Sequence, residues 1–411
     1  MNEAREESSH SHSKNKAKVL VTGATGFVGK QLLHRLLQED RFQPIAFVRP
    51  SSNTQSLPKG VEIREGSLFE HGSLREAVRG VAAVVHLAAM MDFFPKQVEQ
   101  VYRTNVEGTR NLFLACVEER DSRRGHRLGS CKKAKENEMS HASSADSEET
   151  EEGDLCFIYI SSTEAMGAVE RPPADETTEL RPTSDYGRSK VLAEQIVKEL
   201  SDKHKLPHII LRPTGILGPH DEFAFYELVN MVNSGLLCFI PGDGTALLAF
   251  THVEDVVEGI VRALLAGEKE EALNQTYILS VDEAMTYAQW VRFLSHACGR
   301  FSPFLHVPLP LVKVVTALLA PVMNLGKARV FMYNTETVDR MKEHRAFSNK
   351  KAKQFLGWHP KYSLTEAMQH TIDHYFATGR IKRYRLSPFL VLLLSFFCLL
   401  SVGYLFICCS K

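Results

Sequence analysis

A glycine-rich turn, TGATGFVG, constrains the fold of this chain more than any other feature of its sequence. It follows a β-branched run, KVLVT, and precedes leucines that recur with the spacing of an amphipathic helix. Gly23, Gly26 and Gly29 therefore lie between a strand and a helix, where backbone amides can approach a pyrophosphate at the positive end of the helix. An ordinary tight turn is the alternative, but the flanking strand and helix favour a dinucleotide-binding site.

Strand and helix patterns continue to alternate after this turn. Further strands are predicted at 44–48, 61–64, 83–87, 156–160 and 208–211, and helices at 74–78, 106–117 and 186–200. The run at 83–87 is almost continuously apolar, which is typical of a parallel strand buried on both faces. The alternation weakens after the last of these strands. We therefore predict an α/β fold, with a Rossmann-like doubly wound parallel sheet and a smaller C-terminal substrate-binding region.

The predicted domain plan divides the chain into four parts. They are a disordered N-terminal tail, a dinucleotide-binding Rossmann domain, a substrate-binding region and a transmembrane anchor, at 1–17, 18–215, 216–380 and 387–409. The Rossmann part contains a segment, 119–154, that is basic at first and acidic later, with serines between. Such a segment cannot bury enough apolar surface to form a core, so we predict a disordered surface insertion.

The C-terminal run from Phe389 to Cys409 has no charged residue and has about the 20 residues that a membrane-spanning helix needs. A buried core helix is the alternative, but the run lacks a polar face and follows a basic flank, Lys382, Arg383 and Arg385. The polar N-terminus contains neither a signal peptide nor a first span. We expect a tail-anchored protein at the endoplasmic reticulum or a similar intracellular membrane, with its catalytic part in the cytosol.

Composition excludes several classes of partner and site. Lys and Arg number 49 and Asp and Glu number 49, so no net basic field would draw the chain to nucleic acid. The 8 cysteines form no C-x-x-C pair, which is typical of a reducing compartment and not of a disulfide framework. The 17 histidines are scattered without metal-ligand spacing, so we expect no metal.

One further apolar segment, 306–325, is interrupted by prolines and a single lysine. A core or lid helix is one interpretation of it. A monotopic membrane contact that admits a lipophilic substrate is the other.

Tyr186 and Lys190 are spaced as Y-x-x-x-K, which places both side chains on one face of a helix. A tyrosine hydroxyl with a pKa of about 10 is a poor base, but a neighbouring ammonium stabilises the phenolate and suits it to proton exchange with an alcohol. A surface helix with a solvated lysine is the alternative. Ser161, Ser162 and Thr163 argue against it, because they end a strand at the edge where α/β sheets bind ligands. A hydroxyl there can hydrogen-bond a substrate oxygen.

The end of the second predicted strand bears on which dinucleotide is bound. NAD sites carry an acidic residue about 20 positions after the glycines, and this chain has Arg49 there with no acid nearby. An arginine suits a 2′-phosphate, so we predict NADP(H) in preference to NAD(H). A solvated charge at the strand end is the alternative.

Together these motifs resemble those of the extended short-chain dehydrogenase/reductases, over roughly residues 18–376. TGATGFVG is similar to the TGxxGxxG of that family, VVHLAA from Val84 to its strand-four motif, NVEGTRNL from Asn105 to its next helix, and YISSTEAMG to its serine segment. Within the family, the resemblance is to the branch of 3β-hydroxysteroid dehydrogenases, dihydroflavonol-type reductases and nucleotide-sugar epimerases.

The resemblance implies a role for each candidate residue. Tyr186 would act as the acid/base, Lys190 would hold the nicotinamide ribose and tune Tyr186, and Ser162 would donate to the substrate oxygen. With the glycine turn and Arg49, it completes the predicted cofactor-binding set: Gly23, Gly26, Phe27, Val28, Gly29, Arg49, Leu68, Leu87, Ala88, Asn105, Lys190 and Pro213. Two features depart from the family pattern, Ser67 where an Asp often lies beside the adenine, and the insertion at 119–154.

We therefore expect a membrane-anchored NAD(P)-dependent oxidoreductase that transfers a hydride between its cofactor and a secondary alcohol or ketone. A 3β-hydroxysteroid or sterol leads as substrate, because a membrane anchor brings an enzyme to bilayer-soluble molecules. A dihydroflavonol-like carbonyl reductase, a nucleotide-sugar epimerase and a nucleotide-binding membrane scaffold are the alternatives. The expected partners are a lipophilic small molecule and the membrane, without nucleic acid. A homodimer, the direction of hydride transfer and a coupled isomerase or decarboxylation step stay open.

Overall fold

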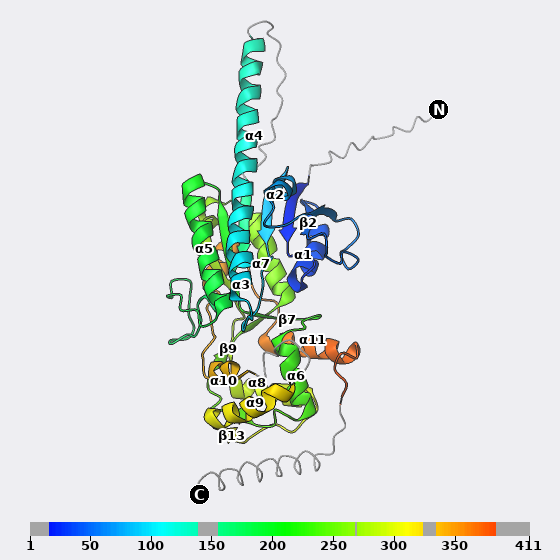
Figure 1. Cartoon of the computed structure of the whole chain (residues 1–411), viewed down its shortest axis with the longest axis vertical. Helices are drawn as coiled ribbons and strands as arrows, with labels where there is room; N and C mark the ends of the chain where they lie inside the picture. The colour runs from blue at the N-terminus through cyan, green and yellow to red at the C-terminus, as the bar shows by residue number, and fades with distance from the viewer. Residues whose placement is uncertain (1–15, 139–154, 268, 324–333, 384–411) are drawn as a thin grey trace, which may run out of the picture.

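The computed structural model describes residues 16–138, 155–267, 269–323 and 334–383. Its centre is a seven-stranded sheet in the order β11-β6-β5-β4-β1-β2-β3 (Figure 1). The strands are β1 (Ala17–Thr22), β2 (Phe42–Val48), β3 (Glu62–Glu65), β4 (Ala83–His86), β5 (Cys156–Ile160), β6 (His208–Pro213) and β11 (Gln275–Leu279). Every neighbouring pair is parallel, so the carboxyl ends of all these strands lie at one edge. The predicted α/β fold and parallel sheet are confirmed.

Helices cover both faces of this sheet. One face carries α2 (His71–Val78), α4 (Gly108–Glu138) and α5 (Asp185–His204), and the other carries α1 (Phe27–Leu37) and α7 (Val253–Ala266). Side chains alternate between these layers, because Val19 and Val21 pack toward α1 and α7 while Leu20 packs toward α2 and α4. Because both faces of the sheet are buried, the sequences of its central strands are almost continuously apolar.

A smaller region lies on the opposite side of the sheet from the projecting end of α4 (Figure 1). Its helices are α6 (Ala224–Ser234), α8 (Tyr287–Ala297), α9 (Leu309–Met323), α10 (Thr335–Arg340) and α11 (Leu364–Ala377). Its short strands pair as β7 (Gly215–Leu217) with β10 (Phe250–His252), β8 (Ile240–Pro241) with β13 (His306–Val307), and β9 (Leu247–Leu248) with β12 (Met285–Thr286). Its core is aromatic, with Phe250 stacked on Trp290 at 5.3 Å between ring centroids.

Two features differ from the predicted domain plan. The chain returns to the sheet after residue 216, because α7 and β11 complete the Rossmann layers and β11 pairs with β6. In addition, α4 continues to Glu138, so residues 119–138 are helical where we predicted disorder. This segment contains no proline and is rich in Arg, Lys and Glu, which have high helix propensity, and an i,i+4 pair joins Glu119 to Arg123 at 2.8 Å. The rest of the predicted insertion, 139–154, lies outside the described residues.

The predicted membrane anchor, 387–409, also lies outside the described residues. Among the helices that are described, none combines the length and the apolar character that crossing a bilayer requires. The predicted N-terminal tail is outside them too, apart from its last two residues.

A buried ion pair fastens α5 to the sheet. Glu194 on α5 and Arg212 on β6 have side chains that are 1% and 2% exposed. Two parallel bonds join them, from Arg212 Nε to Oε1 at 2.8 Å and from Nη2 to Oε2 at 2.5 Å. Ser161, which follows β5, donates its hydroxyl to Glu194 Oε1 at 2.5 Å. The helix is therefore held at the carboxyl ends of two adjacent strands.

Glu194→Gln should be strongly destabilising, because it leaves the Arg212 charge buried without a counter-charge. We expect a loss of about 3–5 kcal/mol in the free energy of unfolding, measured by urea denaturation in mild detergent. Glu76→Gln, which breaks the exposed Glu76–Arg79 pair, is the matched control and should cost less than about 1 kcal/mol. Equal losses in the two variants would contradict this account.

Candidate active site

The glycine turn has the geometry that a bound pyrophosphate requires. Gly23 has φ +67°, and a Cβ there would lie 2.8 Å from the backbone nitrogen of Ala88. A Cβ on Gly29 would lie 2.3 Å from the Gly23 carbonyl oxygen, so α1 could not pack this closely with any other residue. Gly26 caps α1 without a side-chain hydrogen bond, and the first turn has no acidic residue. Backbone amides and the positive helix end therefore suit an anion here.

The structure brings the predicted cofactor-binding residues to the carboxyl edge of the sheet or to the helices beside it. The turn itself and the start of α1 contain Gly23, Gly26, Phe27, Val28 and Gly29; Arg49 follows β2, Leu68 follows β3, Leu87 and Ala88 follow β4, Asn105 precedes α4, Lys190 lies on α5, and Pro213 ends β6. The sheet order reverses between β1 and β4, which is where doubly wound folds bind nucleotides. A dinucleotide site is therefore consistent with the whole set.

Arg49 is exposed directly after β2. The last residue of β3, Glu65, is paired in register with Val48. An acidic residue thus reaches the same edge from the neighbouring strand, which the linear sequence did not indicate.

A chain of hydrogen bonds fixes the switch point. The Ala88 amide donates to Thr22 Oγ1 at 3.1 Å, and this hydroxyl lies 2.7 Å from His86 Nδ1. His86 Nε2 lies 2.9 Å from Thr109 Oγ1, which donates to the Asn105 carbonyl oxygen at 2.7 Å. One neutral tautomer satisfies all four contacts, with Nδ1 accepting from Thr22 and Nε2–H donating to Thr109. Burial lowers the pKa of His86 to about 3, which keeps the ring neutral.

Asn105 extends this chain to the helix that carries Tyr186. It lies in a single π-helical turn, Arg103–Glu107, between α3 (Val98–Tyr102) and α4. Its amide nitrogen donates to the Met90 carbonyl oxygen at 3.0 Å and to Ser189 Oγ at 2.9 Å, and Ser189 donates to the Tyr186 carbonyl oxygen at 2.7 Å. The loop after β4 and the start of α5 are therefore held in register.

Tyr186 and Ser162 meet at the carboxyl end of β5. Burial raises the pKa of the Tyr186 phenol, and the hydrogen bond between Ser162 and that phenol offsets only part of the rise. Gly187 permits this approach, because a Cβ there would lie 2.5 Å from the Glu164 carbonyl oxygen. Ser184 is the N-cap of α5, and its hydroxyl accepts a hydrogen bond from the Gly187 amide at 3.1 Å.

The side chain of Lys190 is bonded to the sheet, and its role toward Tyr186 stays a prediction. Its Nζ donates to the Ile160 carbonyl oxygen at 2.8 Å and lies 5.8 Å from the centroid of the Tyr186 ring. Burial lowers the pKa of Lys190 to about 7. Burial also raises the pKa of Tyr186, and the nearby Glu164 carboxylate adds to this effect. Desolvation therefore outweighs the expected charge stabilisation, and Tyr186 holds its proton.

The aromatic surroundings of Tyr186 were not apparent from the sequence. The Phe93 ring lies 5.4 Å from the Tyr186 ring and 5.9 Å from that of Phe223, with the two phenylalanine rings stacked at 24°. Arg340 lies over the Phe93 ring, with its guanidinium carbon 5.1 Å from the ring centroid. Phe93 follows β4, Phe223 precedes α6 and Arg340 ends α10, so no local pattern links them.

Glu164 forms a charged cluster on the same side. Arg345 donates to its carboxylate at 2.6 Å and Arg340 at 2.8 Å. Burial alone would raise the pKa of Glu164, but the two guanidinium groups outweigh it and lower that pKa. The cluster joins the serine segment to α10 and to the loop that follows it.

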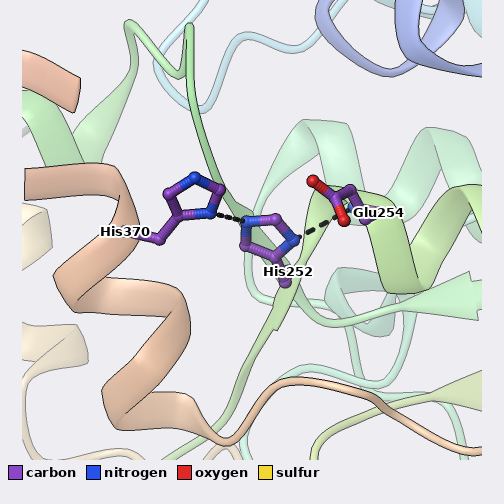
Figure 2. A group of neighbouring side chains, drawn as sticks. All are labelled: His252, Glu254 and His370. Carbon is purple, nitrogen blue, oxygen red and sulfur yellow. Dashed lines mark hydrogen bonds between the residues drawn. The ribbon is translucent and has the colours of Figure 1, made fainter. Parts of the chain in front are cut away.

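Elsewhere in the described part of the chain, His252, Glu254 and His370 form a group of side chains of the kinds that bind metal ions (Figure 2). His252 Nδ1 accepts from the Glu254 backbone amide at 3.3 Å and so caps α7, which requires the proton to sit on Nε2. This Nε2 donates to His370 Nδ1 at 3.0 Å. A metal at Nε2 would leave both His252 nitrogens as acceptors, which a neutral imidazole cannot be. We assign the group to capping of α7, and the expected lack of a metal stays a prediction.

Comparisons with known proteins place this site in a family. Residues 19–276 match the model of the NAD dependent epimerase/dehydratase family. A 3beta-hydroxysteroid-dehydrogenase/decarboxylase isoform 1 of Arabidopsis thaliana is 26% identical over 382 residues, which cover 87% of this chain and 79% of the relative. A sterol-4-alpha-carboxylate 3-dehydrogenase, decarboxylating, of Mus musculus is 23% identical over 363 residues, which cover 87% and 91%. The crystal structure of gox2253 matches with a TM-score of 0.67 and 29% identity, over 89% of this chain and 100% of that chain.

A parallel sheet with a glycine turn at its switch point and a tyrosine–lysine helix beside it defines a nucleotide-dependent enzyme of the Rossmann type. The chain belongs to the NAD dependent epimerase/dehydratase family, and its resemblance to the extended short-chain dehydrogenase/reductases is confirmed. Its relatives are dehydrogenases and epimerases, so the chain is an enzyme of this family.

The lowered pKa of Lys190 predicts a pH-dependent stability. Lys190 titrates near pH 7 in the folded chain and near its ordinary 10.5 when unfolded, so between these values the unfolded state binds a proton that the native state lacks. The free energy of unfolding therefore rises with pH across this window, by up to about 1.4 kcal/mol per pH unit from this group. Lys190→Met removes the effect. The wild-type minus variant difference, measured by urea unfolding, should grow with pH, and a constant difference would contradict the assignment.

Proposed function

We propose that this enzyme transfers a hydride between a nicotinamide dinucleotide and a secondary alcohol or ketone on a lipophilic ring system, such as a 3β-hydroxysteroid or sterol. The contact of Tyr186 with the Phe93 ring, itself stacked on Phe223, carries this proposal. An apolar wall beside the reacting phenol suits a flat hydrocarbon substrate. A sugar ring would instead need polar partners for its hydroxyls.

The proposed roles follow from what each side chain contacts. The bound nicotinamide supplies or accepts the hydride. Tyr186 exchanges the proton with the substrate oxygen, and Ser162, hydrogen-bonded to that phenol, holds the same oxygen. Lys190 donates to Ile160 through one N–H, and its remaining donors suit the ribose hydroxyls. Because burial keeps Tyr186 protonated, the phenol is prepared to donate to a ketone, whereas alcohol oxidation must first remove its proton.

The relatives support a sterol-type substrate, because the Arabidopsis and mouse proteins carry names that refer to 3β-hydroxysteroid and sterol dehydrogenation. A nucleotide sugar is a second candidate substrate, and a separate contact supports it. Arg340 approaches the Phe93 ring while bound to Glu164, which favours a substrate that carries a polar or acidic group, as a nucleotide sugar does. The UDP-glucuronic acid 4-epimerase of Bacillus cereus in complex with NAD has a TM-score of 0.62 at 20% identity over 88% of this chain and 99% of that chain, a likeness of fold alone.

We also propose that the run 387–409 anchors the enzyme in the endoplasmic reticulum or a similar intracellular membrane, with the catalytic part in the cytosol. The charge-free length of this run and the basic residues that precede it support the proposal.

The preference for NADP(H) is proposed from Arg49, which is exposed at the end of β2. Arg49→Asp should shift the preference toward NAD(H), because a carboxylate repels the 2′-phosphate and accepts from the 2′-hydroxyl. This is tested by measuring the affinities of the wild type and of the Arg49→Asp variant for NADP(H) and NAD(H) by fluorescence titration. A wild type that already binds NAD(H) tenfold more tightly (~1.4 kcal/mol) would rule out the preference.

Tyr186→Phe tests the proposed acid/base. The change should lower turnover by about 100-fold or more, because the hydroxyl moves the proton, and should leave cofactor affinity nearly unchanged because the ring still packs. Initial rates with a sterol alcohol, together with cofactor titration, measure both effects. Tyr102→Phe is the matched control, since it removes a hydroxyl that donates at 3.3 Å to Asp185, the residue before Tyr186 on α5. Activity of Tyr186→Phe within a few-fold of the control would exclude the role.

A further inference from the structure

A loop between α8 and β13 exposes two aromatic rings to solvent. Phe301 and Phe304 are 83% and 87% exposed, and the adjacent Leu305 is 53% exposed. The loop is nevertheless fixed in place, because Ile240 donates its backbone amide to the Leu305 carbonyl oxygen at 2.8 Å and Arg292 Nε donates to that of Pro303 at 3.3 Å. Fully exposed phenylalanines on a fixed loop are unfavourable in water and mark a surface that meets an apolar partner.

The next helix along the chain, α9, adds to this surface. Val314 and Leu318 lie on one face of it, one turn apart, and are 50% and 63% exposed, and Leu319 beside them is 42% exposed. The helix contains a single charged residue, Lys313, which pairs with Asp339 at 2.6 Å. A helix in a water-soluble protein ordinarily turns its polar side outward, whereas α9 turns apolar side chains outward.

Basic side chains and the end of the described chain lie near the loop. Burial raises the pKa of the Cys298 thiol, at the C-terminus of α8, to about 11. The charges of Arg300 and Arg383 lie close enough to this thiol to oppose the rise. Asn233 on α6 donates to the Lys382 carbonyl oxygen at 2.8 Å, which fixes the place where the chain leaves the fold. The apolar run that begins at residue 389 is then within about 20 Å of Arg383, even for a fully extended chain.

We propose that this surface, formed by Phe301, Phe304, Leu305 and the outward face of α9, docks into the interfacial layer of a lipid bilayer. The inference does not depend on the proposed catalytic activity, but it rests in part on the proposed membrane anchor. A bilayer fits the surface for two reasons: its apolar side chains are exposed along a fixed loop and the helix that follows it, and the described chain ends close to that loop, a few residues before its apolar run.

Docking of this kind would give the catalytic part a fixed orientation. A single span joined by a short linker restricts the height of a domain above the bilayer but leaves its rotation free. A second contact through the loop and α9 removes that freedom. The C-terminal region, and not the projecting end of α4, would then face the membrane (Figure 1).

The test places a fluorescent probe at the surface of the full chain. Phe304→Trp is conservative at a side chain this exposed, and the native Trp290 and Trp358 are buried, so subtraction of the wild-type signal isolates the new emission. The protein is added to phosphatidylcholine vesicles with a minor fraction of phosphatidylserine, with and without brominated acyl chains. Leu192→Trp is the matched control, because Leu192 is 40% exposed on α5, away from the proposed surface.

We expect brominated lipid to quench roughly half or more of the added Phe304→Trp emission and little of the Leu192→Trp emission. Emission that aqueous iodide quenches and brominated lipid does not would overturn the proposal, because the surface then faces water. Emission shielded from both quenchers would overturn it too, since the apolar run of the same chain or a second copy would then cover the rings. Equal quenching of the two variants would show that the contact is not confined to this surface. Cofactor binding, measured on the same samples, reports separately on the catalytic site.

Discussion

The ion pair between Glu194 and Arg212 fixes the geometry on which the candidate active site depends. Both side chains are almost fully buried, so the pair is not weakened by solvent, and Ser161 adds a third polar contact. Arg212 comes from β6 and Ser161 follows β5, while Glu194 lies one helical turn beyond Lys190 on α5. The helix that carries Tyr186 is therefore positioned by charge and by hydrogen bonds at the edge where parallel strands end.

Burial at this edge sets the chemistry as much as the identity of the residues does. It lowers the pKa of Lys190 to about 7 and raises that of Tyr186, so both groups favour their neutral forms. Burial likewise lowers the pKa of His86, and the hydrogen bonds from Thr22 to Asn105 are satisfied by its neutral ring. The site thus combines a protonated phenol with an aromatic wall, and the proposal of a lipophilic substrate rests on this combination.

Local patterns in the sequence were sufficient for six of the seven strands, the glycine turn and the Tyr186–Lys190 helix, because each depends on residues within about one turn or one strand of each other. The seventh strand, β11, was not predicted, because it follows the intervening elements of the smaller region. Phe93, Phe223 and Arg340 could not be found in this way, since they come from three separated loops and helices. The effect of burial on the pKa values of Lys190 and Tyr186 was not foreseen, because the Y-x-x-x-K spacing gives proximity but not burial. The helical residues 119–138 were mispredicted because charge content was weighed above their helix propensity and the lack of proline. The roles of the site residues remain predictions.

The central claim is hydride transfer to or from a lipophilic secondary alcohol or ketone. The most direct measurement is the absorbance of reduced nicotinamide when the full chain, in mild detergent, is mixed with each cofactor and with 3β-hydroxysterols, flavonoid ketones or sugar nucleotides in turn. The account predicts an enzyme-dependent change with a sterol or its ketone and none with sugar nucleotides. Turnover of a sugar nucleotide without turnover of any sterol would contradict it.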